Sequence, residues 1–327
     1  MVGDQQMVKT NQTTTSIDKD SLKGRDFLTL LDYSSEEIAY LIQLAYDMKQ
    51  DTLAGKTPDI LAGKTLGMIF EKNSTRTRIS FEVGMIQLGG HGLFMNARDL
   101  QIGRGESVSD TGKVLSEFLD GVMIRAKSHK MVEELAEHTS VPVINGLTDL
   151  FHPCQAMADL LTIKEVKGDL KGLKLSYIGD GNNVAHSLVI AGAHMGMHVS
   201  VATPKGYEYH SGLLEKAKGI AKSNGGSVTS TYDPIESSTD ADAIYTDVWT
   251  SMGQEEEAAK RLVDFKDFQI NDQLVSHAKK DYVFLHCLPA HREEEVSTSV
   301  IDGSNSYVFQ QAGNRLHAQK AILASLL

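Results

Sequence analysis

At residues 65–82 the chain reads Thr65-Leu66-Gly67-Met68-Ile69-Phe70-Glu71-Lys72-Asn73-Ser74-Thr75-Arg76-Thr77-Arg78-Ile79-Ser80-Phe81-Glu82. The apolar run that ends at Phe70 predicts a buried strand, and the spacing of Ile79, Val83 and Ile86 predicts a helix after it. The turn between them brings together hydroxyl groups, two guanidinium groups and the unpaired N–H groups of a helix start. Such donors, and the positive end of the helix dipole, favour an anion. Because Arg can hold a phosphate with two hydrogen bonds, the turn predicts a phosphate site.

The same turn also has a simpler interpretation. Ser or Thr before a helix is a common N-cap, often followed by a Glu that closes a capping box. Arg76 and Arg78 could then be solvated surface residues. The turn alone does not decide between these interpretations, so the choice depends on the rest of the chain.

Strand-like apolar runs alternate with helix-like periodic segments along most of the chain. Strands are expected at 65–70, 92–95, 121–125, 141–145, 173–180, 199–202, 243–247 and 280–288. Helices are expected at 35–49, 74–88, 108–119, 131–137, 153–166, 184–195, 212–223 and 312–327. Repeated β–α alternation predicts mostly parallel sheets with helices on both faces. With 327 residues, we expect an α/β protein of two doubly wound parallel-sheet domains, residues 1–150 and 151–312, with the active-site cleft between them.

Polar residues follow several of the predicted strands. Arg125, Asp180, Asp247 and the run His286-Cys287-Leu288-Pro289 all stand at strand ends, and Asn182-Asn183 comes just after Asp180. Ligands of open α/β sheets bind outside the carboxyl ends of the strands. The pattern therefore predicts a cleft between the domains, with one ligand on each side.

Two segments invite more specific interpretations. His152 and Gln155 lie about one helical turn apart, so both can point at a ligand, although a His at a helix start is more often a cap. Gly179-Asp180-Gly181-Asn182-Asn183 could suggest a dinucleotide fingerprint, but Val184 occupies the place of its third glycine. We therefore expect no nucleotide there; two Asn at a turn suit a carboxylate or zwitterionic ligand.

The second half holds two more candidate segments. Asp247 could pair with a cationic amine and Ser251 with a carboxylate, although a capping Asp followed by a core Trp is the simpler interpretation. Cys287 ends a strand beside polar groups, where a thiol can be partly ionised. No metal-ligand spacing recurs around either Cys, and His194 and His198 are expected to be structural.

Composition limits the class of protein. The formal net charge of −11 argues against a nucleic-acid surface. Two Cys allow one disulfide at most, and no apolar run approaches the roughly 20 residues that span a bilayer. The Thr- and Gln-rich start over residues 1–18 lacks a secretory h-region, so we expect a disordered tail and a cytoplasmic protein without membrane contact.

From about Phe27 onward, four segments taken together resemble the aspartate/ornithine transcarbamylase family, and within it the branch that acts on ornithine. Ser74-Thr75-Arg76-Thr77-Arg78 is similar to the family's carbamoyl-phosphate signature, and His152-Pro153-Cys154-Gln155 to its second signature. Asp247-x-x-x-Ser251-Met252-Gly253 and His286-Cys287-Leu288-Pro289 are similar to the ornithine-specific ones. Each is weak alone, but four in the right order make the resemblance strong.

The resemblance implies a carbamoyl-phosphate site in the first domain and an ornithine site in the second. The residues implied for carbamoyl phosphate are Ser74, Thr75, Arg76, Thr77, Gln101, Arg125, His152, Gln155, Cys287, Leu288 and Arg315. Those implied for ornithine are Asn183, Asp247, Ser251 and Met252. The implied catalytic residues are Arg125, His152, Asp247, Cys287 and Arg315.

The family resemblance also implies an assembly and a reaction. The family is trimeric at its core, and Gln101 would reach into a neighbouring subunit's site. The final helix, 313–327, would return to pack on the first domain. The ornithine δ-amine would attack carbamoyl phosphate to give citrulline, and neither a metal nor an organic cofactor is expected.

Three alternatives remain open from the residues. A sister transcarbamylase could use aspartate, putrescine or an acylated ornithine, although Ser251-Met252-Gly253 and Cys287 favour ornithine. A dinucleotide-dependent dehydrogenase is disfavoured by Val184. A two-lobed binding protein would explain a cleft, but not the combination of Arg76, His152 and Cys287.

Overall fold

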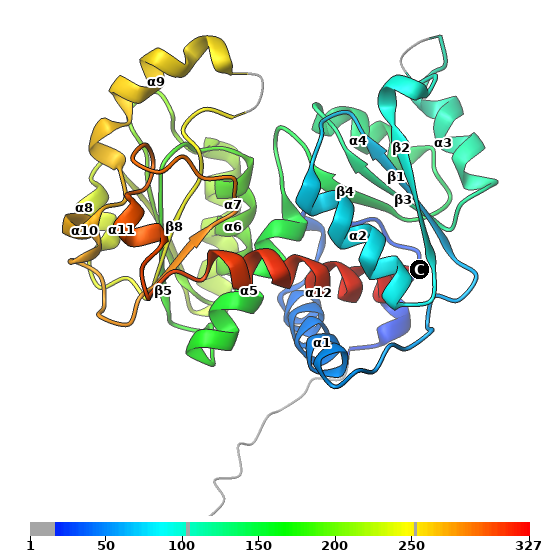
Figure 1. Ribbon diagram of the computed structural model, residues 1–327, viewed down its shortest axis with the longest axis horizontal. Coiled ribbons are helices and arrows are strands. Elements are labelled where there is room, and N and C mark those ends of the chain that lie inside the picture. The colour runs from blue at the N-terminus through cyan, green and yellow to red at the C-terminus, as the bar shows by residue number, and fades with distance from the viewer. Residues whose placement is uncertain (1–16, 103–104, 252–253) are drawn as a thin grey trace, which may run out of the picture.

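Two parallel β-sheets, each covered by helices on both faces, lie side by side in the computed structural model (Figure 1). The structure describes residues 17–102, 105–251 and 254–327, so most of the N-terminal tail expected to be disordered lies outside it. The predicted fold class is confirmed.

The first sheet has four parallel strands whose two faces pack into different cores. Its order is β2 (His91–Asn96), β1 (Thr65–Phe70), β3 (Gly121–Arg125), β4 (Val143–Leu147). Because side chains alternate along a strand, Met68 joins one core while Ile69 joins the other. The helices of this half are α1 (Ser35–Leu53), α2 (Thr75–Gln87), α3 (Val108–Ser116) and α4 (His129–Glu137).

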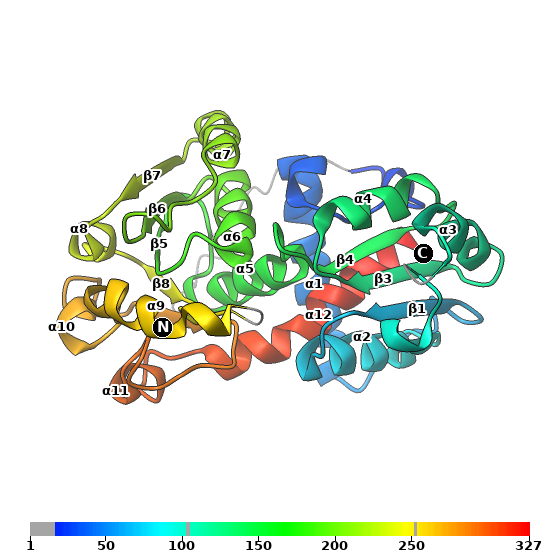
Figure 2. The same cartoon turned by 90° about the horizontal axis from the view of Figure 1, so that it is seen from above.

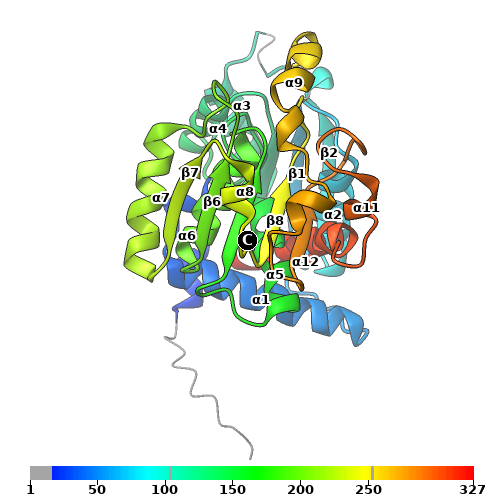
Figure 3. The ribbon, with the colours of Figure 1, turned by 90° about the vertical axis from the view of Figure 1, so that its left-hand side faces the viewer.

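The second sheet has five parallel strands in the order β7 (Ser227–Thr231), β6 (His198–Ala202), β5 (Lys174–Ile178), β8 (Ala243–Thr246), β9 (Val283–His286). Its helices are α6 (Asn183–His194), α7 (Ser211–Asn224), α8 (Pro234–Ser238), α9 (Ala258–Asp264), α10 (Asp272–Val275) and α11 (Thr298–Ile301). Figure 3 shows α6 and α7 on one side of this sheet and α11 on the other. Trp249 is buried in the core of the second side, as its simpler interpretation predicted.

Two helices run between the halves. α5 (Pro153–Lys167) and α12 (Val308–Leu326) pack along each other, and α12 also contacts α1, α2 and β9 (Figures 1 and 2). α5 in turn contacts β4 of the first sheet and β9 of the second. The domain ranges 1–150 and 151–312 therefore remain a prediction, because α5 and α12 belong to the packing of both halves.

Local signals placed most helices correctly, but not every buried face. Ser34 and Glu37 form the capping box that starts α1. In α2, however, Phe81, Gly84 and Met85 are among the buried residues, whereas Ile79 and Ile86 are 54% and 62% exposed. The apolar spacing identified the helix correctly and its core-facing side incorrectly.

Candidate active site

The Ser-Thr-Arg-Thr turn lies where β1 gives way to α2. Ser74 is the N-cap, and its Oγ accepts a hydrogen bond from the Thr77 N–H at 3.2 Å, so the simpler interpretation of Ser74 is correct. Arg76 reaches across to the second half, where its Nη2 donates to the Leu288 carbonyl at 2.7 Å. Arg78 turns elsewhere: it lies 3.8 Å from the centre of the Phe94 ring. The turn thus contributes one of its two guanidinium groups to the junction between the halves.

Three arginines from three elements surround the buried His152 at the start of α5. They are Arg76 of α2, Arg125 at the end of β3, and Arg315 of α12. His152, Arg125 and Arg315 are 5%, 6% and 2% exposed. Burial and these arginines hold the pKa of His152 well below its usual value, so the imidazole is neutral. Burial and the neighbouring Arg315 likewise lower the pKa of Arg125 to about 10.

Several polar atoms of this cluster are buried but unpaired. The His152 Nδ1, the Arg125 Nε and the Arg315 Nε have no hydrogen-bond partner among the described residues. Native structures rarely leave buried polar atoms unsatisfied, so each such group needs an explanation. Positive charge converging on one place, with spare hydrogen-bonding capacity, is what an anionic ligand with acceptor oxygens would satisfy.

Gln155 connects this cluster to the helices that bridge the halves. Its Oε1 accepts from the Arg315 Nη1 at 2.7 Å, and the Arg315 Nη2 donates to the Thr77 Oγ1 at 3.3 Å. Its Nε2 donates to Asp159 at 2.8 Å. The sequence grouped His152 with Gln155, and the structure places Arg315 against both.

On the second half, Asp247 and Cys287 meet at the ends of neighbouring strands. The Cys287 thiol donates to the Asp247 Oδ1 at 3.0 Å, and the Asn182 Nδ2 donates to the Asp247 Oδ2 at 2.8 Å. Burial of the thiol and the adjacent carboxylate raise the pKa of Cys287 well above its usual value. The expected partial ionisation of Cys287 is therefore wrong, since the group beside it is an anion rather than a cation.

The other residues implied for ornithine lie in the neighbouring loops. Asn183 opens α6 and donates its Nδ2 to the Thr148 carbonyl at 2.5 Å, which ties it to the segment before α5. The Ser251 N–H donates to the Gln254 Oε1 at 3.0 Å. Met252 lies outside the described residues.

The loop after β9 holds Leu288 in an unusual backbone conformation. Its φ is +58°, a left-handed value that costs a residue with a side chain of order 1–3 kcal/mol. Its N–H donates to the His286 Nδ1 at 2.9 Å, while its carbonyl accepts from Arg76. The surrounding hydrogen bonds thus hold Leu288 at the junction, with its carbonyl toward the first half.

Two further candidates lie outside the cluster of three arginines. Asp180 ends its strand as predicted, but it pairs with Arg261 at 2.9 Å and so fastens α9 instead of facing the junction. Gln101 is exposed, in the segment between β2 and α3. In Figure 1, α3 lies at the outer end of the first half, on the side away from the second half.

Asp247, His286 and Cys287 could in principle hold a metal ion, because each offers a ligand atom within 4.8 Å of the others. Both ring nitrogens of His286 are engaged, however: Nδ1 accepts from Leu288, and Nε2 lies 3.1 Å from the Glu295 Oε1. With the Cys287 thiol protonated as well, these residues are arranged for hydrogen bonding.

Sequence reasoning missed two residues of the buried network, Asp159 and Gln311. The Asp159 Oδ1 accepts from Gln155 and, at 2.7 Å, from the Gln311 Nε2. Burial raises the pKa of Asp159 to about 7, against the opposing effect of these hydrogen bonds. The spacing of Gln155 and Asp159, four residues apart in a predicted helix, was a signal that could have indicated the contact.

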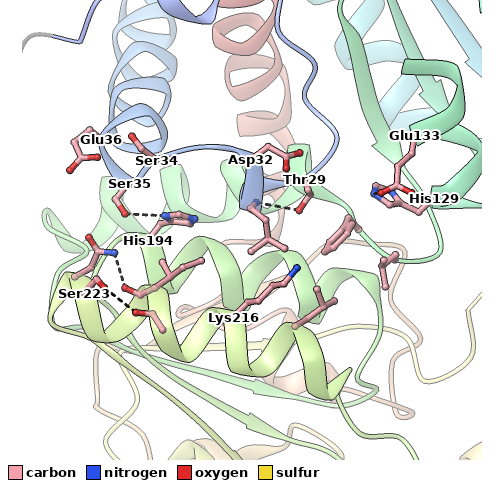
Figure 4. A pocket seen from close by; sticks show the side chains of 17 residues that line it. Thr29, Asp32, Ser34, Ser35, Glu36, His129, Glu133, His194, Lys216 and Ser223 are labelled. Carbon is pink, nitrogen blue, oxygen red and sulfur yellow. Dashed lines mark hydrogen bonds and ion pairs between the residues drawn. The ribbon is translucent and has the colours of Figure 1, made fainter. Parts of the chain in front are cut away.

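A surface groove lies elsewhere, along the junction of the halves (Figure 4). It has a volume of about 1050 Å³, and none of the candidate site residues lines it. In it the His194 Nδ1 lies 2.9 Å from the Ser35 Oγ. His198 lies 2.9 Å from the Ser227 Oγ on the second sheet, so both histidines are structural, as predicted.

Comparisons with known proteins agree with this geometry. Residues 25–165 match the family model for the carbamoyl-P binding domain of aspartate/ornithine carbamoyltransferase, and residues 171–326 match the model for its Asp/Orn binding domain. An ornithine carbamoyltransferase from Anoxybacillus flavithermus is 62% identical, covering 94% of this chain and 98% of that protein. An ornithine carbamoyltransferase from Bacillus subtilis is 60% identical, covering 95% of this chain and 97% of that protein. The solved ornithine carbamoyltransferase from Pyrococcus furiosus is 56% identical, over 93% and 97%, with a TM-score of 0.91.

Proposed function

The chain belongs to the aspartate/ornithine carbamoyltransferase family, and on this basis we infer that it is an ornithine carbamoyltransferase. It transfers the carbamoyl group of carbamoyl phosphate to the δ-amine of L-ornithine, giving L-citrulline and phosphate. The observation that carries this from the geometry is the set of buried, unpaired nitrogens on His152, Arg125 and Arg315. Arg76, whose charge also lowers the pKa of His152, donates to the Leu288 carbonyl of the second half.

We propose that carbamoyl phosphate binds on the first-domain side of this junction. The phosphate lies at the start of α2, held by Ser74, Thr75, Arg76 and Thr77. The Thr77 N–H is already taken by Ser74, which leaves the preceding N–H groups of the first turn for the ligand. The carbamoyl end is held by Arg125, His152, Gln155, Cys287, Leu288 and Arg315.

Ornithine binds on the second-domain side of the junction, where the Asp247 carboxylate offers hydrogen-bond acceptors. Asp247 takes its α-ammonium group, and Asn183 and Ser251 bind its α-carboxylate. Met252, which lies outside the described residues, is the fourth residue expected to bind ornithine. The extended amino acid then points its δ-amine toward Cys287 and Leu288. The support for this orientation is the carboxylate of Asp247, which is 6% exposed and accepts a hydrogen bond from the Cys287 thiol.

The reaction needs a neutral amine, although a primary amine of this kind has a pKa near 10 in water. The amine nitrogen forms a bond to the carbamoyl carbon, and the C–O bond to phosphate then breaks. The proton that the amine loses leaves on the phosphate. Arg76, Arg125 and the neutral His152 stabilise the tetrahedral oxyanion, and preorganised donors of this kind are each worth about 3–4 kcal/mol. Holding both substrates in one cleft supplies much of the remaining acceleration.

We propose that three copies of the chain assemble and share their sites. The first domain exposes large apolar side chains that a monomer would leave in water: Ile79, Ile86, Leu93, Val114 and Phe118. Gln101 lies in the same half, on a segment leading to its outer end, which suits a contact with a neighbour's carbamoyl phosphate. A closed ring of such contacts is a homotrimer.

We place the enzyme in the cytoplasm and in arginine biosynthesis. Both cysteines are free thiols, as in a reducing compartment. No helix in the described part of the chain is long and apolar enough to cross a membrane. A solved relative from Campylobacter jejuni, 40% identical, is described as an anabolic ornithine carbamoyltransferase.

A citrulline assay with a panel of amines tests the function. The purified enzyme is supplied with carbamoyl phosphate and, separately, L-ornithine, putrescine, L-aspartate and N-acetyl-L-ornithine. Carbamoylation of ornithine with a kcat/KM far above the others is expected. Preferential carbamoylation of another amine would identify a sister transcarbamylase instead.

A further inference from the structure

Asp159 is a buried acidic residue that is not among the residues proposed to bind substrate, although it hydrogen-bonds one of them, Gln155. It lies in the middle of α5 and is fully buried. Its Oδ1 accepts two hydrogen bonds, from the Gln155 Nε2 at 2.8 Å and from the Gln311 Nε2 at 2.7 Å. Its Oδ2 has no partner among the described residues. A buried acid in a helix that mostly packs apolar side chains needs a reason to be there.

The amides of Gln155 and Gln311 connect Asp159 to two different parts of the proposed site. Gln155 turns its Oε1 to the Arg315 Nη1, which in turn reaches Thr77 at the phosphate loop. Gln311 turns its Oε1 to the backbone N–H of His286 at 3.0 Å, directly before Cys287 and Leu288. One oxygen atom is therefore connected to the carbamoyl-phosphate side and to the loop beside the ornithine amine.

The polarity of these hydrogen bonds matters as much as their position. Oδ1 of Asp159 can only accept, so both amides must present their NH₂ groups to it and their oxygens outward. Outward oxygens are what Arg315 and the His286 N–H require, since both are donors. With either amide reversed, acceptor would face acceptor at Asp159 and donor would face donor at Arg315 or at the His286 N–H, which would leave buried groups unpaired.

We propose that Asp159 is a positioning residue for carbamoyl transfer: by accepting from both Gln155 and Gln311 it orients Arg315 and the His286–Leu288 loop toward each other. The inference rests on the function proposed above. Asp159 touches no substrate, and its effect passes through the two glutamines. Gln311 is thereby assigned a role as well, since it is the link to the His286 backbone.

Three substitutions test this in the intact enzyme. Asp159→Leu has a similar branched outline, although it is larger, and it removes the acceptor oxygens. Asp159→Asn keeps an acceptor oxygen that can serve both amides. Thr162→Val is the control variant. Thr162 lies one turn further along α5, and its substitution removes the hydrogen bond from the Asn314 Nδ2 at 2.9 Å, which is also a buried contact between α5 and α12 but lies away from the site.

The measurement is kcat/KM for carbamoyl phosphate at saturating ornithine, alongside the thermal unfolding midpoint. Asp159→Leu is expected to lose about 10–100-fold in kcat/KM, as is typical when partners that orient functional ligands are removed. Asp159→Asn should stay close to the unsubstituted enzyme. Thr162→Val should lower the unfolding midpoint without lowering kcat/KM.

The proposal is overturned if Asp159→Leu folds and keeps its kcat/KM, if Asp159→Asn is as impaired as Asp159→Leu, or if Thr162→Val loses equally. Should Asp159→Leu fail to fold, Gln311→Met removes the connection between Asp159 and His286, together with the hydrogen bond from Gln311 to the Tyr245 hydroxyl. An unchanged kcat/KM for Gln311→Met would overturn the proposal by itself. Failure of the unsubstituted enzyme to make citrulline would instead refute the proposed function.

Discussion

Removing the Arg76 guanidinium should cripple turnover while leaving the fold intact. Arg76 is half-buried, lies beside the neutral His152, and donates to the Leu288 carbonyl at 2.7 Å. Loss of one preorganised donor to a developing anion costs about 10²–10³-fold in kcat, equivalent to about 2.7–4 kcal/mol. Loss of a charged hydrogen bond such as that to Leu288 adds roughly 1.5–3 kcal/mol where it stays desolvated. The first effect alone predicts a fall of at least about 10²-fold for Arg76→Ala.

The assay is steady-state citrulline formation with both substrates varied, together with circular dichroism to confirm folding. Arg76→Lys distinguishes the effect of charge from that of shape. Because Lys keeps the positive charge but lacks the planar guanidinium group, the kcat of Arg76→Lys should lie between those of the unsubstituted enzyme and Arg76→Ala. Arg292→Ala is a control for losing an arginine, because Arg292 forms a surface ion pair with Asp302 at 2.6 Å. A near-normal kcat for a folded Arg76→Ala enzyme would refute the assigned role of the phosphate loop.

Two other perturbations follow from the structure. Gln101→Ala should impair activity. Refolding the Gln101→Ala and Arg76→Ala proteins together should restore some activity, because a mixed trimer contains a site with both residues intact. If activity is not restored at any mixing ratio, the sites are not shared between subunits. His186, 6% exposed, donates from Nδ1 to the Leu150 carbonyl at 2.9 Å, and burial lowers its pKa from 6.5 to about 4. The unfolded chain therefore takes up this proton first, so the contribution of His186 to stability is present above pH 6.5 and is lost as the pH falls toward 4. The free energy of unfolding is measured with urea at pH 7 and at pH 4. Between these two pH values it should fall by about 3 kcal/mol more for the unsubstituted protein than for His186→Gln. An equal fall in both proteins would contradict the lowered pKa of His186.

The alternation of strands and helices was predictable because each signal is local. β1, β3 and β5 are buried apolar runs, and α1 carries a complete capping box, so neighbouring residues alone specify them. β7 was missed because Ser227-Val228-Thr229-Ser230-Thr231 has one apolar residue and lies at the edge of its sheet. The short helices α8, α10 and α11 were missed for a similar reason, since four or five residues carry too little periodicity.

The candidate site shows the same difference between residues that local sequence patterns indicate and residues whose contacts are distant in the chain. His152, Asp247 and Cys287 stand at strand or helix ends, where a local pattern indicates exposure to a ligand. What Cys287 experiences is not local: its thiol is held protonated by Asp247, forty positions away in the chain. Asp159 and Gln311 were invisible for the same reason, because their contacts join α5 to α12 across 152 positions. Likewise, Ile79 and Ile86 point away from the core because α12 covers the other side of α2.

The long helix α12 has a consequence for biosynthesis. It emerges from the ribosome after every other element described, yet it packs on α1 and α2 and brings Arg315 to Thr77 of the proposed phosphate site. An N-terminal domain that folds during translation would therefore wait with an incomplete core and an unfinished catalytic pocket. Nascent chains would be inactive until their last helix docks, and premature stop codons anywhere upstream of it would yield fragments prone to capture by chaperones.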